Sequence, residues 1–62
     1  MNNYNIIANT ETEKYEIINN IREVGATLTG VSSYYNNSYY IQLNATPEQV
    51  FLLNKKLGGA AW

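Results

Sequence analysis

The sequence predicts one small α+β domain with the element order β-α-β-β-α, in which two helices pack on one face of a three-stranded sheet. Three observations carry this prediction. Apolar residues alternate near the amino terminus, two Thr-initiated capping patterns each precede an apolar stripe that ends at Gly, and an Asn-Asn pair separates two tyrosine-rich runs. The single domain spans residues 1–62, and residues 58–62 are expected to form a flexible tail.

The first strand is expected at residues 4–8, because Tyr4, Ile6 and Ala8 alternate there with Asn5 and Ile7. Successive side chains of a strand point to opposite faces of its sheet. The first set is therefore expected on the core face, and the second set on the exposed face.

The first helix is expected to begin at a Thr10 cap and to end at Val24. Residues 10–13 read Thr-Glu-Thr-Glu, a capping box in which the Thr10 hydroxyl accepts from the Glu13 amide and the Glu13 carboxylate accepts from the Thr10 amide. Gly25 supplies the left-handed residue that ends the helix. The apolar stripe consists of Ile17, Ile18, Ile21 and Val24.

A β-hairpin is expected around Asn36 and Asn37, because Asn tolerates the positive φ angles of a two-residue type I′ turn. Its strands are residues 26–35 and 38–45. Gly30 is expected to mark a bulge or a place where a helix side chain approaches the backbone. With this loop length, the core face carries Leu28, Gly30, Ser32, Tyr34, Tyr39, Ile41, Leu43 and Ala45, and the other face carries Thr29, Val31, Ser33, Tyr35, Tyr40, Gln42 and Asn44.

The second helix is expected to begin at a second capping box, Thr46-Pro47-Glu48-Gln49, with Pro in the favoured first helical position. It runs to Leu57 and ends at Gly58. The apolar residues of this helix fall into two sets, which are Val50, Leu53 and Leu57 on the core side and Phe51 and Leu52 off that side.

A right-handed crossover makes the first two strands parallel and lets the third insert between them, which gives the strand order 1-3-2. A sheet with the first strand beside the second remains open as an alternative. The order 1-3-2 with both helices on one face resembles a ferredoxin-like fold that lacks its last strand.

Composition restricts the function classes. The chain holds four Lys and Arg residues, five Glu residues, and neither His, Cys nor Asp, with a net charge of −1. This balance argues against nucleic-acid binding, and the absence of a long apolar run argues against a membrane span. We expect no metal or other cofactor, and a cytoplasmic location. We also expect no enzymatic activity, because no nucleophile and base pair stands out. The chain is similar in length and in its first β-α-β unit to small tautomerase subunits, but Asn2 stands where they carry a catalytic proline.

Three surfaces are candidates for binding. The first strand forms a sheet edge without Lys or Pro, so another chain could pair with it. The helix-free face carries exposed tyrosines among Asn, Ser and Gln, a composition typical of recognition surfaces. A patch on the second helix combines exposed apolar side chains with the carboxyl-terminal Trp. The candidate residues are Asn5, Ile7, Tyr35, Tyr40, Gln42, Phe51, Leu52 and Trp62.

The sequence therefore predicts a small non-enzymatic protein–protein interaction module with a protein partner, either a heterologous protein or a second copy in a homodimer. Its size, acidity and ten Asn residues fit a phage or mobile-element inhibitor or regulator of a host protein. Two alternatives remain open. One is a single-stranded nucleic-acid binder that uses the sheet tyrosines, and the other is a subunit whose main role is homo-oligomer assembly.

Overall fold

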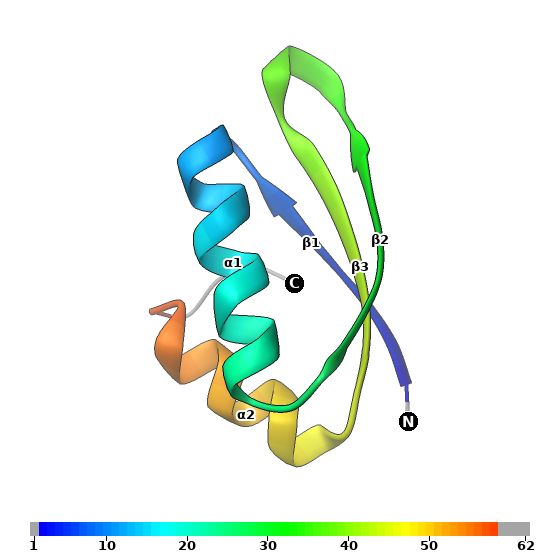
Figure 1. The fold of residues 1–62 in the computed structure, drawn as a ribbon, viewed down its shortest axis with the longest axis vertical. Helices are drawn as coiled ribbons and strands as arrows, with labels where there is room; N and C mark the ends of the chain where they lie inside the picture. The colour runs from blue at the N-terminus through cyan, green and yellow to red at the C-terminus, as the bar shows by residue number, and fades with distance from the viewer. Residues whose placement is uncertain (1, 59–62) are drawn as a thin grey trace.

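A computed structural model describes residues 2–58 of the chain. Its antiparallel sheet has the order β1-β3-β2, with β1 at Asn2–Ala8, β2 at Thr27–Ser33 and β3 at Tyr39–Ala45. Helices α1 (Glu11–Glu23) and α2 (Pro47–Lys56) lie on the same face of this sheet (Figure 1). The predicted α+β fold and strand order are confirmed, and the alternative with β1 beside β2 is excluded.

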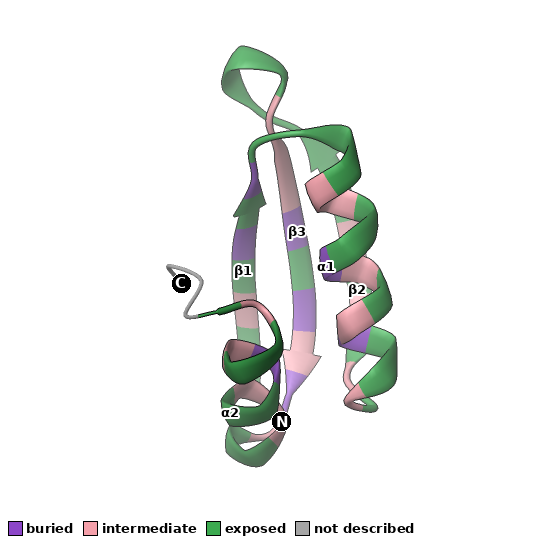
Figure 2. Cartoon of the chain, turned by 90° about the vertical axis from the view of Figure 1, so that its left-hand side faces the viewer, coloured by how far each residue is buried: buried purple, intermediate pink, exposed green. Residues whose placement is uncertain are grey.

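The core lies between the sheet and the two helices, where Figure 2 shows the buried positions of β1, β3 and the helices. Strand β3 occupies the centre of the sheet and alternates buried with less buried residues from Ile41 to Ala45. Ile6 and Ala8 of β1 share this face, as the sequence predicts. The buried residues are Ile6, Ala8, Ile17, Ile21, Ile41, Leu43, Ala45 and Leu53.

Both helices begin at the predicted threonines, but the two caps differ. At α2 the full capping box forms, since the Thr46 amide donates to Gln49 Oε1 at 2.9 Å and the Gln49 amide donates to Thr46 Oγ1 at 3.2 Å. At α1 the Glu13 amide donates to Thr10 Oγ1 at 3.1 Å. Within residues 2–58, the Glu13 carboxylate does not complete the second bond of the predicted box.

The predicted glycines end both helices. Gly25 has a φ of 82° and Gly58 a φ of 68°, which is the left-handed region. At the end of α1, the Ala26 amide donates to the Ile21 carbonyl and the Gly25 amide donates to the Arg22 carbonyl, both at 3.1 Å. These two bonds form a Schellman motif, which satisfies carbonyls at the end of the helix.

The predicted hairpin register is wrong, although the turn residues are correct. Asn36 and Asn37 both have positive φ, and the Ser38 amide donates to the Tyr35 carbonyl across the turn at 3.0 Å. The Tyr34 amide, however, also donates to the Ser38 carbonyl at 2.8 Å. Two residues of one strand therefore oppose one residue of the other, and this bulge shifts the pairing by one residue, so that Ser33 lies opposite Tyr39.

A second irregularity in β2 lies between Leu28 and Gly30, where the sequence predicts a bulge. Between the two bulges, the faces of β2 are the reverse of the prediction. Val31 lies opposite Ile41, on the core side, and Gly30 lies opposite Gln42, on the other side. Beyond the second bulge the shift amounts to two residues, so Leu28 returns to the core face opposite Leu43. The side chain that approaches Gly30 belongs to Gln42 of the neighbouring strand, not to a helix.

Candidate functional site

The sheet face opposite the helices brings together four of the predicted site residues. Asn5 lies directly opposite Gln42, and Ile7 directly opposite Tyr40. We call this the open face. By register it carries Asn3, Asn5 and Ile7 from β1, Tyr40, Gln42 and Asn44 from β3, and Thr27, Gly30 and Ser32 from β2. None of these side chains carries a charge.

Four of the nine residues of the open face are carboxamides. Asn3 lies opposite Asn44 in the register, next to the pair of Asn5 and Gln42. A shallow hollow of about 410 Å³ lies over this part of the sheet and is bordered by Asn3, Tyr4, Asn5, Thr29, Tyr40, Gln42 and Leu43. Amides offer both donors and acceptors, but phosphate contacts are made chiefly by Lys and Arg. This face therefore lacks the charge that nucleic-acid binding draws on.

Three tyrosines gather at the turn end of the open face, and one of them was not predicted there. Tyr34 stacks on Tyr40 with ring centroids 5.9 Å apart, and meets Tyr35 edge-on at 5.0 Å. Tyr35 itself lies in the 3₁₀ turn Tyr35–Asn37 instead of the strand and is 76% exposed. The bulge at the turn moves Tyr34 away from its predicted place on the core face.

The predicted apolar patch on α2 is present in part. Phe51 is 59% exposed and Leu52 is 48% exposed, and with Pro47 and Glu48 they border a shallow hollow of about 430 Å³. The Lys55 ammonium lies 5.0 Å from the centre of the Phe51 ring. Trp62, the third predicted member, lies outside the described residues.

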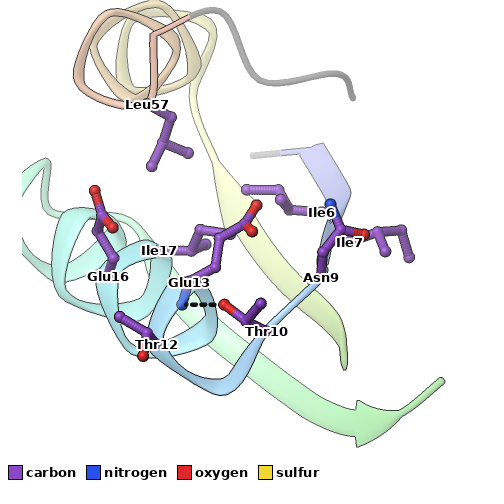
Figure 3. A pocket seen from close by; sticks show the side chains of 9 residues that line it. All are labelled: Ile6, Ile7, Asn9, Thr10, Thr12, Glu13, Glu16, Ile17 and Leu57. Atoms are coloured by element: carbon purple, nitrogen blue, oxygen red, sulfur yellow. Dashed lines mark hydrogen bonds between the residues drawn. The ribbon is translucent and has the colours of Figure 1, made fainter. Parts of the chain in front are cut away.

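A third hollow, larger than the two above, was not predicted from the sequence. It has a volume of about 720 Å³ and lies between the end of β1, the first turns of α1 and the end of α2 (Figure 3). We call it the β1 groove. Its lining residues are Ile6, Ile7, Asn9, Thr10, Thr12, Glu13, Glu16, Ile17 and Leu57.

The β1 groove has an apolar interior and lies beside an edge strand. Figure 3 shows Ile6 and Leu57 pointing into the groove from different elements, with Ile17 between them. Ile7 also borders the groove, but its side chain points away from it, in agreement with its place on the open face. β1 has β3 as its neighbour on one side and none among the described strands on the other. The groove thus lies alongside a sheet edge.

Two carboxylates lie on the α1 side of the β1 groove. The Glu13 side chain extends toward Ile6 instead of returning to Thr10, and Glu16 follows one turn later (Figure 3). Within residues 2–58, neither carboxylate forms an ion pair, because the one ion pair of that part of the chain joins Lys56 to Glu23 at 2.9 Å. The groove is therefore apolar inside and acidic at one wall.

The described residues contain no group of three or more carboxylate, His or Cys side chains that could hold a metal ion. They also form no helix that is long and apolar enough to cross a membrane. Comparisons with family models, curated proteins and solved structures find no match to this chain.

Proposed function

We propose that this chain is a non-enzymatic protein–protein interaction module that binds an extended segment of a partner protein along the edge of β1. The observation that supports the proposal is a regular sheet edge without Lys or Pro, beside the β1 groove of about 720 Å³. In strand addition, main-chain hydrogen bonds to the edge supply affinity, and adjacent pockets for alternate side chains supply specificity.

The two edges of the sheet differ in how well they could accept another strand. All seven residues of β1 pair with β3 in one uninterrupted register, from Asn2 opposite Ala45 to Ala8 opposite Tyr39. Neither β1 nor β2 contains Lys or Pro, which natural proteins use to discourage pairing at an edge, so regularity is what separates the two edges. β2 is interrupted by a bulge between Leu28 and Gly30, and bulges disturb edge pairing. These differences favour β1 as the binding edge.

A pair of proline substitutions tests which edge binds. Ile7 in β1 is 37% exposed and Val31 in β2 is 41% exposed, and both are β-branched residues of an edge strand. Proline cannot donate a backbone hydrogen bond, so each substitution disturbs one edge. The probes are nine-residue peptides selected from a random displayed library on the wild-type chain, and their binding is measured by fluorescence anisotropy.

We expect Ile7→Pro to weaken peptide binding at least tenfold and Val31→Pro to leave it within about threefold. Because Ile7→Pro could also unfold so small a domain, Ile7→Lys serves as a second variant that keeps the backbone amide and places a charge at the edge. Circular dichroism verifies the fold of each variant. Selected peptides that bind Ile7→Pro and Ile7→Lys as well as the wild type would overturn the proposal.

Molar mass from light scattering over a wide range of protein concentration tests the same edge in a different way. We expect a monomer at all concentrations, because a β1 edge that binds a heterologous partner is not paired with a second copy. A dimer that dissociates on Ile7→Lys would mean that β1 pairs with a second copy, and assembly would then replace the proposed function. A dimer unaffected by that substitution would place the contact elsewhere and leave the β1 edge available to a partner, as proposed.

A further inference from the structure

We infer that the β1 groove selects a partner strand in which one apolar side chain is flanked, on the same face of the strand, by lysine or arginine. This inference rests on the proposed function, because it assumes that an extended segment pairs with β1. It adds the chemistry of the segment, which follows from the two kinds of side chain that line the groove.

The apolar requirement follows from the interior of the groove. Ile6 of β1 and Leu57 after α2 point into the same space, and Ile17 of α1 lies between them (Figure 3). Ile6 and Ile17 are already buried by the chain itself, so the apolar surface that is still open here belongs to Leu57, which is only partly buried. A partner side chain that enters here removes apolar surface from water, which is the main source of favourable free energy in such contacts.

The basic requirement follows from Glu13 and Glu16. These residues are three positions apart on α1, so both lie on the side of the helix that borders the groove. The cations of the chain are positioned elsewhere. Lys14 lies over the Tyr15 and Tyr39 rings at 4.4 and 4.5 Å, and Lys56 pairs with Glu23. Among the described residues no basic side chain lines the groove, so a partner cation would meet two carboxylates that form no ion pair within residues 2–58.

The same charges disfavour a second copy of this chain as the occupant. Its β1 strand carries no Lys or Arg that could approach Glu13 or Glu16. A heterologous basic segment therefore matches the charge of the groove better than a second copy does.

The periodicity of a strand fixes the spacing of the required residues. Alternate side chains point to the same face, so the two cations belong two positions before and two positions after the apolar residue. The cognate probe is the acetylated, amidated peptide Ser-Lys-Thr-Val-Thr-Lys-Ser. Its isomer Ser-Thr-Lys-Val-Lys-Thr-Ser has the same composition but places both lysines on the face opposite the valine. A third peptide replaces the lysines of the cognate probe by glutamate.

The three peptides are titrated into the ¹⁵N-labelled full chain at low ionic strength, and binding is followed by amide chemical shifts. We expect the cognate peptide to shift amides of β1 and of the first turns of α1, and to bind about tenfold more tightly than its isomer or the glutamate peptide. The preference should shrink in 0.5 M NaCl, since salt screens exposed charges.

Matched substitutions on α1 distinguish the effect of the two groove carboxylates on peptide binding from the effect of the net charge of the chain. The double variant Glu13→Gln/Glu16→Gln keeps the side-chain size and should abolish the preference for the cognate peptide. Glu11→Gln removes a charge from the same first turn at a residue that does not line the groove, and it should preserve the preference. Leu57→Ser should weaken the binding of all three peptides by a similar factor, because it changes the apolar interior of the groove.

The possible outcomes distinguish this inference from the proposed function. Shifts along β1 with equal affinity for all three peptides would overturn the charge requirement and leave strand addition intact. Shifts confined to the open face or to α2 would overturn both. A variant without residues 59–62 provides a further test. If it binds the cognate peptide tenfold more tightly than the full chain does, the chain's own end occupies the groove, and the inference of a partner strand is overturned.

Discussion

The Tyr34 ring stacks on the Tyr40 ring at the turn end of the open face, with centroids 5.9 Å apart and planes inclined by 30°. Tyr35 contacts the same Tyr34 ring edge-on, with an interplanar angle of 67°. Tyr34 is therefore the centre of a three-ring cluster that connects the turn to β3. Stacked and edge-to-face pairs of this kind add stability beyond the area that they bury.

The first prediction concerns the centre of this cluster. Tyr34→Ala removes both ring contacts and should lower the free energy of unfolding by about 1 kcal/mol. Tyr35→Ala is the matched control, because it removes only one ring contact and Tyr35 is 76% exposed. This substitution should lower the free energy of unfolding by less than about 0.5 kcal/mol. Urea denaturation followed by circular dichroism measures both. Equal losses for the two variants would contradict the central role of Tyr34.

The helices follow from local signals that the sequence shows directly. Thr10 and Thr46 start the helices, Gly25 and Gly58 end them, and every predicted core position between them except Ile18 belongs to the core cluster. The strand order needs more than local signals. A right-handed crossover is compatible with the order β1-β3-β2 but also with β1 beside β2, and the structure decides between them.

The register of the hairpin could not be predicted, because it depends on two bulges. The Asn36-Asn37 turn has the expected backbone, yet the extra bond from the Tyr34 amide to the Ser38 carbonyl shifts the strand by one residue. Nothing in the local sequence distinguishes the shifted pairing, since both registers place large residues on each face. The gain from placing Val31 opposite Ile41, where the prediction has Ser32, becomes evident only in the assembled sheet.

The β1 groove was missed for a related reason. Its lining comes from three separate segments, and the sequence assigned Glu13 to a capping box and Ile6 and Ile17 to the core. Those assignments are correct for the two isoleucines, which are buried. The position of the Glu13 carboxylate depends on whether it returns to the Thr10 amide, and the sequence pattern does not decide that. The edge position of β1, by contrast, was predicted.

The second prediction contrasts the two caps. Gln49→Ala removes the bond from the Thr46 amide and should destabilise the domain by about 0.5–1 kcal/mol. Glu13→Ala removes no hydrogen bond of the described structure and should be close to neutral. The hydroxyl side of both caps is intact, so Thr46→Ala and Thr10→Ala should each cost about 1 kcal/mol. A destabilisation by Glu13→Ala equal to that of Gln49→Ala would show that the first box closes in solution.

The third prediction concerns two glycines that respond oppositely to the same substitution. At Gly25 the φ of 82° is costly for any residue with a Cβ, so Gly25→Ala should destabilise by about 1–2 kcal/mol. At Gly30 the obstacle is Gln42 Oε1, 3.0 Å from the added Cβ, on an exposed side chain that can move. Gly30→Ala should therefore stabilise slightly, by about 0.5 kcal/mol, through the lower entropy of the unfolded chain.

Thermal unfolding of both glycine variants measures these effects, and a double-mutant cycle with Gln42→Ala isolates the contact at Gly30. In the Gln42→Ala background the stabilisation by Gly30→Ala should increase, because the opposing oxygen is gone. An unchanged value would mean that Gln42 already moves aside without cost. A destabilisation by Gly30→Ala in both backgrounds would point to the bulged backbone as the obstacle.

The last prediction tests how the small core depends on α2. Leu53 is the one buried residue of this helix and is 0% exposed, whereas its neighbour Leu52 is 48% exposed. Leu53→Ala leaves a cavity between α2 and the sheet and should cost about 3 kcal/mol. A domain of 62 residues has a total stability of only about 3–9 kcal/mol, so the midpoint of thermal unfolding should fall by about 12 °C or more.

Leu52→Ala is the matched control, because it makes the same chemical change one position along the same helix. Because Leu52 is 48% exposed, its substitution should shift the midpoint of thermal unfolding by only a few degrees, at every protein concentration. The opposite result would be a fall in the midpoint as large as that of Leu53→Ala, with a difference from the wild type that grows as protein concentration rises. It would mean that a second copy covers Leu52 and Phe51. The α2 patch would then be an assembly surface, and the β1 edge would still be available for the proposed partner strand.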